Sequence, residues 1–161
     1  MTSQVWRFWP SYQNQELLMA SFTKVNDFVK NMANAMDLDS DTLVVALSNT
    51  DPTAGTDASA DGNGVLANIS EIAYTNLSSR TLANVTSTQT SGTYKLSADD
   101  LVLTASGGSV AAFRYVVVYN DTPTSPADPI IGYYDYGSSL TLNDGDTFTI
   151  DIGSNGILTL T

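Results

Sequence analysis

Aspartate is the residue through which this chain could do most chemistry, because it supplies 15 of the 17 acidic side chains while histidine and cysteine are absent. Without imidazole or thiolate there is no Ser-His-Asp triad, no Cys-His nucleophile and no tetrahedral zinc site of the usual kind. What remains is carboxylate chemistry, which means acid–base catalysis at a glycosidic bond or the binding of calcium.

Two aspartate-rich segments have part of the pattern of a calcium-binding loop. Asp37, Asp39 and Asp41 give the D-x-D-x-D opening, but that loop lacks the glycine at its sixth position and the glutamate at its twelfth. The segment 57–68 has the glycine and ends on Asn68 where glutamate is needed. Neither pattern is complete, and no pair of carboxylates has the spacing of a glycosidase. We therefore expect no catalytic residues, no metal and no other cofactor.

A run of tyrosines around one aspartate, at 133–136, resembles a sugar-stacking patch with a polar partner. Because successive side chains of a strand point to opposite faces, Tyr134 and Tyr136 share one face, and Tyr133 and Asp135 share the other. Tyr134 and Tyr136 are therefore the candidate glycan contacts if the protein binds carbohydrate.

The charge balance excludes other classes of partner. The net charge is −11, the pI is about 4.1, and the six basic residues are scattered along the chain. Binding to duplex phosphates needs a concentrated basic face, so we expect no nucleic-acid partner. The longest aliphatic run, 116–118, is far too short to cross a bilayer, and residues 1–10 lack the apolar core of a signal peptide. We expect no membrane partner.

The chain reads as two parts, 1–41 and 42–161. In the first part the spacing of apolar residues predicts an amphipathic helix over 11–36. Its stripe has spacings of 4, 3, 4, 3 and 4 residues and consists of Leu18, Phe22, Val25, Val29, Met32 and Met36. Such a helix either packs on its own β domain or meets a partner, which can be another copy of the chain.

An extended arm of residues 1–10 precedes this helix and contains Trp6, Phe8 and Trp9. Each of these side chains carries roughly 150–250 Å² of surface, which is unfavourable in water. The arm, called the aromatic arm below, therefore folds back on the domain or anchors the chain in a neighbour. We take its three aromatic residues and the stripe from Leu18 to Met32 as the candidate partner-binding residues.

From Thr42 onward the period changes to two, which predicts an antiparallel β-sandwich or jelly-roll-like domain over 42–161. The expected strands cover residues 42–48, 65–73, 82–87, 93–97, 101–105, 110–120, 130–136, 139–142, 147–152 and 156–161. The segment 110–119 is apolar on both faces and reads as a central strand, with Arg114 extending to its rim or paired with an aspartate. Asn155 and Gly156 predict a hairpin between the last two strands.

Two passages resemble a known group of proteins. The segment 22–50, with F-T-K-V-N-D-F-V-K and M-D-L-D-S-D-T-L-V-V-A-L-S-N-T, is similar to the opening of tailed-bacteriophage (cyanophage-like) virion structural proteins. The segment 105–122, A-S-G-G-S-V-A-A-F-R-Y-V-V-V-Y-N-D-T, is similar to a later strand of that group. The similarity continues through P-I-I-G-Y-Y-D-Y-G and D-G-D-T-F-T-I-D-I and covers about 22–161, with the aromatic arm outside it.

The resemblance implies a capsid decoration, or cement, protein on the outer surface of the virion. Its implied partners are the major capsid protein and further copies of itself, as a homotrimer, because decoration proteins often sit at three-fold positions. It carries over no catalytic residue. The alternative is a tail-fibre or adhesin domain that binds a host surface glycan.

Overall fold

The computed structural model describes residues 21–53 and 64–161, and these form a mainly β structure with one α-helix. The elements in chain order are β1 (Phe22–Lys24), α1 (Phe28–Ala35), β2 (Leu43–Ser48), the 3₁₀ turn η2 (Leu66–Asn68), β3 (Thr86–Thr90), β4 (Thr93–Ser97), β5 (Leu101–Thr104), β6 (Phe113–Asn120), β7 (Ile130–Leu140), β8 (Thr147–Ile150) and β9 (Leu158–Leu160).

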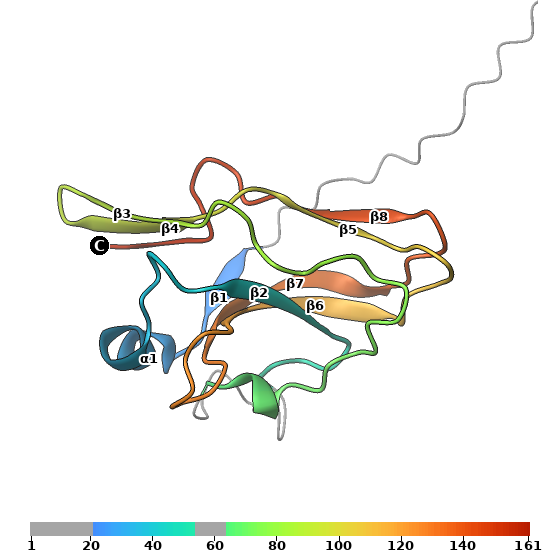
Figure 1. Ribbon diagram of the computed structural model, residues 1–161, viewed down its shortest axis with the longest axis horizontal. Coiled ribbons are helices and arrows are strands. Elements are labelled where there is room, and N and C mark those ends of the chain that lie inside the picture. The colour runs from blue at the N-terminus through green and yellow to red at the C-terminus, as the bar shows by residue number, and fades with distance from the viewer. Residues whose placement is uncertain (1–20, 54–63) are drawn as a thin grey trace, which may run out of the picture.

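The strands lie in two layers and every strand pair is antiparallel, as the sequence predicts (Figure 1). One layer is the sheet β1-β7-β6-β2. The other contains the three-stranded sheet β3-β4-β9 and the pair β5-β8. The molecule is therefore a β-sandwich, with α1 beside one end of the four-stranded sheet.

Aromatic side chains join the two layers. Phe148 on β8 packs edge-to-face against Phe113 on β6, with 5.4 Å between ring centroids, and against Tyr136 on β7, at 5.6 Å. Phe113 is fully buried, as are Leu96 and Leu103 from the second layer. These contacts place the core between the sheets, where apolar burial contributes most of the stability.

Strands β2 and β6 are buried on both faces, which explains why their sequences are nearly continuous runs of apolar residues. One face contacts the second layer, and the connections that contain η2 cover the other face (Figure 1). The N–H of Leu66 donates to the carbonyl of Asp128, and the N–H of Ile130 donates to that of Gly64, so these connections are tied to each other and to β7. The prediction of a central strand at 110–119 is confirmed, since β6 lies between β2 and β7.

Within the described residues, which begin at Ser21, the helix predicted over 11–36 is present but shorter than predicted. Residues 22–24 form β1 and pair with β7, Phe22 opposite Tyr134, and α1 begins only at Phe28. A Cβ on Gly132 would overlap the carbonyl oxygen of Thr23 and the ring of Phe22, so the glycine on β7 allows β1 to approach. Val25 and Phe28 are fully buried in the same core as the later strands, so one core spans both sides of position 41.

Two further predictions about strands are wrong. Residues 65–73 form η2 and isolated bridges, Val65 with Pro129 and Ser48 with Glu71, in place of a strand. The turn before Gly156 does not join a hairpin, because β8 pairs with β5 and β9 pairs with β4. Gly156 does adopt the expected positive φ, 74°.

Candidate functional site

The predicted partner-binding residues that the structure describes lie on and around β1 and α1. Ser21 is exposed, and the chain enters the four-stranded sheet through β1, one of its edges. The ring of Phe22 on β1 packs against Tyr134, with 4.9 Å between centroids, and is half-buried. Phe22 therefore supports the sheet and shows part of its surface to solvent.

The helix α1 buries one side in the core and exposes one large apolar side chain, that of Val29. Phe28 and Asn31 are buried, while Val29 keeps 47% of its surface exposed and Met32 and Met36 are half-buried. Val29 and Met32 lie at i and i+3 on adjoining parts of the helix surface, Met36 is the extended residue that ends the helix, and both methionines also pack against the core. We call Val29, Met32 and Met36 the outer stripe.

Not every residue of the predicted stripe lies on this surface. Val25 has no exposed surface, so its assignment as a partner contact is wrong; it precedes the helix, and its N–H bonds the carbonyl of Ile131, 3.2 Å away. Trp6, Phe8, Trp9 and Leu18 lie outside the described residues. The structure thus brings together only the later part of the predicted set.

The candidate glycan residues lie on one face of β7, as alternation predicts, but that face looks toward the second layer. Tyr134 packs on Phe22, and Tyr136 packs on Phe148. Burial is the main reason that the pKa of Tyr134 rises to about 12. Both side chains are half-buried and serve as packing residues.

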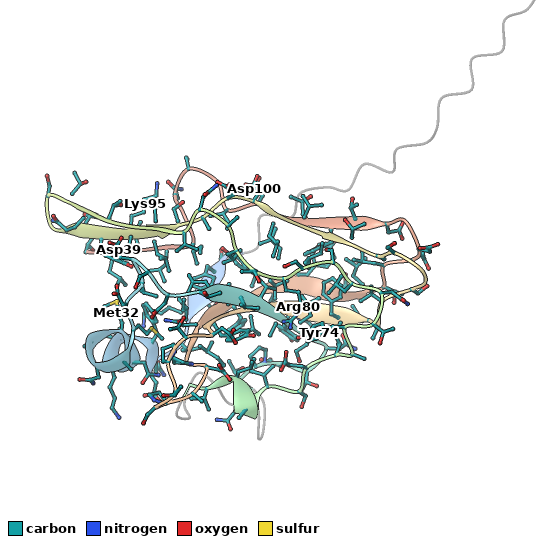
Figure 2. All side chains as sticks on the ribbon, viewed as in Figure 1. Met32, Asp39, Tyr74, Arg80, Lys95 and Asp100 are labelled. Atoms are coloured by element: carbon teal, nitrogen blue, oxygen red, sulfur yellow. The ribbon has the colours of Figure 1, made fainter. Side chains whose placement is uncertain are left out.

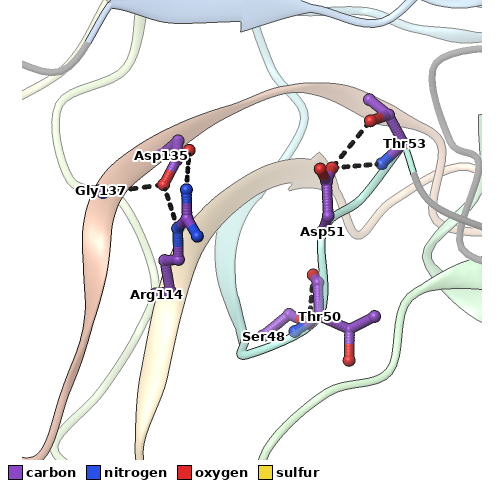
Figure 3. A network of polar contacts seen from close by, with 7 residues as sticks. All are labelled: Ser48, Thr50, Asp51, Thr53, Arg114, Asp135 and Gly137. Atoms are coloured by element: carbon purple, nitrogen blue, oxygen red, sulfur yellow. Dashed lines mark hydrogen bonds and ion pairs between the residues drawn. The ribbon is translucent and has the colours of Figure 1, made fainter.

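The opposite face of β7 carries an ion pair. Arg114 Nε and Nη2 each donate to a carboxylate oxygen of Asp135 at 2.7 Å, and the N–H of Gly137 donates to the same carboxylate at 2.8 Å (Figure 3). The sequence leaves two roles open for Arg114, and the structure selects the ion pair with an aspartate. Tyr115 and Tyr133 pack edge-to-face beside it, with 6.3 Å between centroids.

The ion pair with Arg114 sets the protonation state of Asp135 and so determines whether this carboxyl group can act as an acid. The hydrogen bonds from Arg114 lower the pKa of Asp135, so the carboxylate is charged at neutral pH and holds no proton to donate. Asp51, on a nearby segment, accepts hydrogen bonds from the N–H and hydroxyl of Thr53 at 2.9 and 2.8 Å (Figure 3). Asp135 is therefore not set up as a general acid, and the hydrogen bonds of Asp51 stabilise the local turn at 51–53.

A third polar cluster covers the outer edge of β2 and was missed by the sequence reasoning. The hydroxyl of Tyr74 accepts the N–H of Leu47 at 3.0 Å and donates to the carboxylate of Glu71. The guanidinium of Arg80 lies 3.6 Å from the centre of the Tyr74 ring and donates to the carbonyl of Val45 (Figure 2). No motif signals the contacts to β2, because Tyr74 and Arg80 are 27 and 35 residues away in sequence from the backbone groups that they bond.

The first candidate calcium loop is closed by its own hydrogen bonds. The carboxylate of Asp41 accepts the N–H of Asp37 at 2.7 Å and the side-chain amide of Asn120 at 2.6 Å. Within residues 21–53 and 64–161, no three acidic side chains come together in a way that could hold a metal ion. No helix in this part of the chain is long and apolar enough to span a membrane.

Comparison of the chain with models of known protein families, with curated proteins and with solved structures found no match.

Proposed function

We propose that this protein is a non-enzymatic structural protein of a tailed-bacteriophage particle, a decoration protein that binds the outside of the assembled shell and stabilises it. The observation that carries the proposal is the outer stripe at α1, where Val29 is exposed and Met32 and Met36 are half-buried, a few residues after β1, the first described strand. Arm and stripe together form the attachment surface, and the major capsid protein is the partner.

The physical argument is one of mass action. A protein that binds the assembled shell and not its dissociated subunits stabilises the shell in proportion to its affinity and concentration. Trp6, Phe8 and Trp9 carry some hundreds of Å² of apolar surface, and at about 25 cal/mol/Å² their burial in a neighbour is favourable by several kcal/mol before ordering costs. The sandwich itself provides a stable body with both of its layers packed on one core.

The remaining support is the resemblance of 22–50 and 105–122 to virion structural proteins, and the net charge of −11. A strongly acidic outer coat keeps particles apart in solution by repulsion. Decoration of three-fold positions by homotrimers is the arrangement that the resemblance implies, and we include it in the proposal.

A matched pair of variants tests the attachment surface. Val29 and Val102 are exposed to 47% and 49%, but Val29 is on α1 and Val102 is on β5 in the other layer. We expect Val29→Asp and deletion of residues 1–10 each to weaken co-sedimentation with shells assembled from the major capsid protein of the same virus. Val102→Asp should bind like the wild type. If the wild type and all three variants bind the shells equally, neither the arm nor the stripe takes part in attachment.

A further inference from the structure

Among the described residues, strand β3 is an exposed edge that carries no charge. It is the outermost strand of the sheet β3-β4-β9, and four of its five residues are exposed. Its sequence, Thr-Ser-Thr-Gln-Thr over 86–90, contains neither proline nor lysine, and its pairing with β4 has no bulge. Proteins usually protect an edge strand with one of these devices. By contrast, the edge of β2 is covered, because Tyr74 and Arg80 bond its backbone.

The turn at the end of β3 fixes which backbone groups face outward. Ser91 and Gly92 have φ of 51° and 88°, as in a two-residue hairpin turn of the I′ type, and they connect Thr90 to Thr93. In such a hairpin the residues that flank the turn form a hydrogen-bonded pair, and bonded and non-bonded pairs then alternate along the strands. Ser87 and Gln89 therefore direct their N–H and C=O groups away from β4.

The charge distribution indicates what can cover this edge. The chain has a net charge of −11, so most surfaces of two copies repel each other, but residues 85–94 contain no charged side chain. The strand is also nearly the same when read in either direction, Thr-Ser-Thr-Gln-Thr, with Thr88 at its centre. Two copies of β3 can thus meet antiparallel with threonine opposite threonine, which is a favourable cross-strand pair.

We propose that the β3 edge is a two-fold contact between copies of this chain, in which two β3 strands pair antiparallel about Thr88. Ser87 of one copy is then opposite Gln89 of the second copy, and the outward backbone groups of these residues form four hydrogen bonds. The two three-stranded sheets become one continuous six-stranded sheet. The contact goes beyond the proposed function and does not depend on shell binding; on a shell it would link neighbouring trimers.

Cysteine cross-linking tests the register, because the natural chain has no cysteine. In the proposed dimer Thr88 is opposite its own copy in a non-hydrogen-bonded pair, where Cα atoms lie about 4.5 Å apart and a disulfide can form. Thr88→Cys should give a covalent dimer under mild oxidation of the full chain. Thr86→Cys alone should not, but a mixture of Thr86→Cys with Thr90→Cys should. Thr149→Cys, at another exposed threonine, on β8, is the control.

Analytical ultracentrifugation of the uncross-linked protein supplies a second readout. Thr88→Lys places like charges directly opposite each other and should weaken self-association by about tenfold or more, while Thr149→Lys leaves it unchanged. Cross-linking of Thr149→Cys as fast as Thr88→Cys would overturn the proposal. So would a Thr88→Lys protein that associates as strongly as the wild type, or a wild type that stays monomeric at millimolar concentration.

Discussion

Replacing Tyr74 by phenylalanine removes one oxygen atom and should destabilise the protein by much more than a typical surface change. The hydroxyl of Tyr74 accepts the N–H of Leu47 at 3.0 Å, and Leu47 has no exposed surface. That N–H lies on the side of β2 away from β6, where the chain 71–82 covers the edge. In the Tyr74→Phe protein the buried donor loses this acceptor, and water cannot reach it without opening the edge.

The magnitude follows from the cost of an unsatisfied buried group, about 1–3 kcal/mol. Burial and the hydrogen bond to Glu71 raise the pKa of Tyr74, so the hydroxyl is protonated at neutral pH and keeps both of its hydrogen bonds. For a chain of this size, a loss of 1 kcal/mol lowers the melting temperature by about 2–4 °C, so we expect a decrease of roughly 2–12 °C.

Thermal and guanidinium unfolding, followed by circular dichroism, measure this loss. Tyr94→Phe is the matched control, since its hydroxyl accepts the Ser87 hydroxyl at 3.2 Å in a half-buried site and should contribute less than about 0.5 kcal/mol. Equal stability of the two variants would refute the view that the Tyr74 hydroxyl satisfies the buried N–H of Leu47 at the edge of β2.

Two other substitutions test the core and the electrostatics. Phe148→Ala removes the ring that joins the two layers and should cost about 3–5 kcal/mol in the free energy of unfolding, against less than about 0.5 kcal/mol for Val102→Ala at an exposed site of the same layer. A loss below about 1 kcal/mol would show that the layers do not share one core. Asp128 has a raised pKa because of burial and the charges of Asp121 and Glu71, so the folded state loses stability as pH rises through that pKa. Asp128→Asn should therefore have a higher free energy of unfolding than the wild type at pH 7, and the difference should shrink below a pH of about 4. If Asp39→Asn stabilises the protein equally at pH 7, the change in net charge alone explains the effect.

The sequence predicts the sandwich well because period-two alternation is a local signal of strands that bury one face. The predicted range 93–97 coincides with β4, and the apolar run at 110–119 correctly marks a central strand. Apolar composition reports burial and not pairing, however. Val65 and Ile69 are both buried, as a strand at 65–73 would require, but the chain there covers the sheet and pairs with β2 only through an isolated bridge.

Long-range pairing accounts for the other errors. The spacing from Leu18 to Met36 fits a helix. In the structure, however, Phe22 pairs with β7, more than 100 residues away in sequence, and Asn26-Asp27 forms the turn that precedes α1. Asp27 is a residue type that commonly stands before a helix, so this start signal was present in the sequence. Nothing local could have paired Arg114 with Asp135, or Tyr74 with Leu47, because the sheet sets those contacts.

Cryo-electron microscopy of virus particles that contain this protein tests the central claim most directly. A decoration protein should give density at repeated positions over the outer shell, into which the sandwich fits with the outer stripe of α1 and the chain before Ser21 directed toward the capsid subunits. Density confined to the tail would contradict this account and support the alternative of a glycan-binding fibre domain.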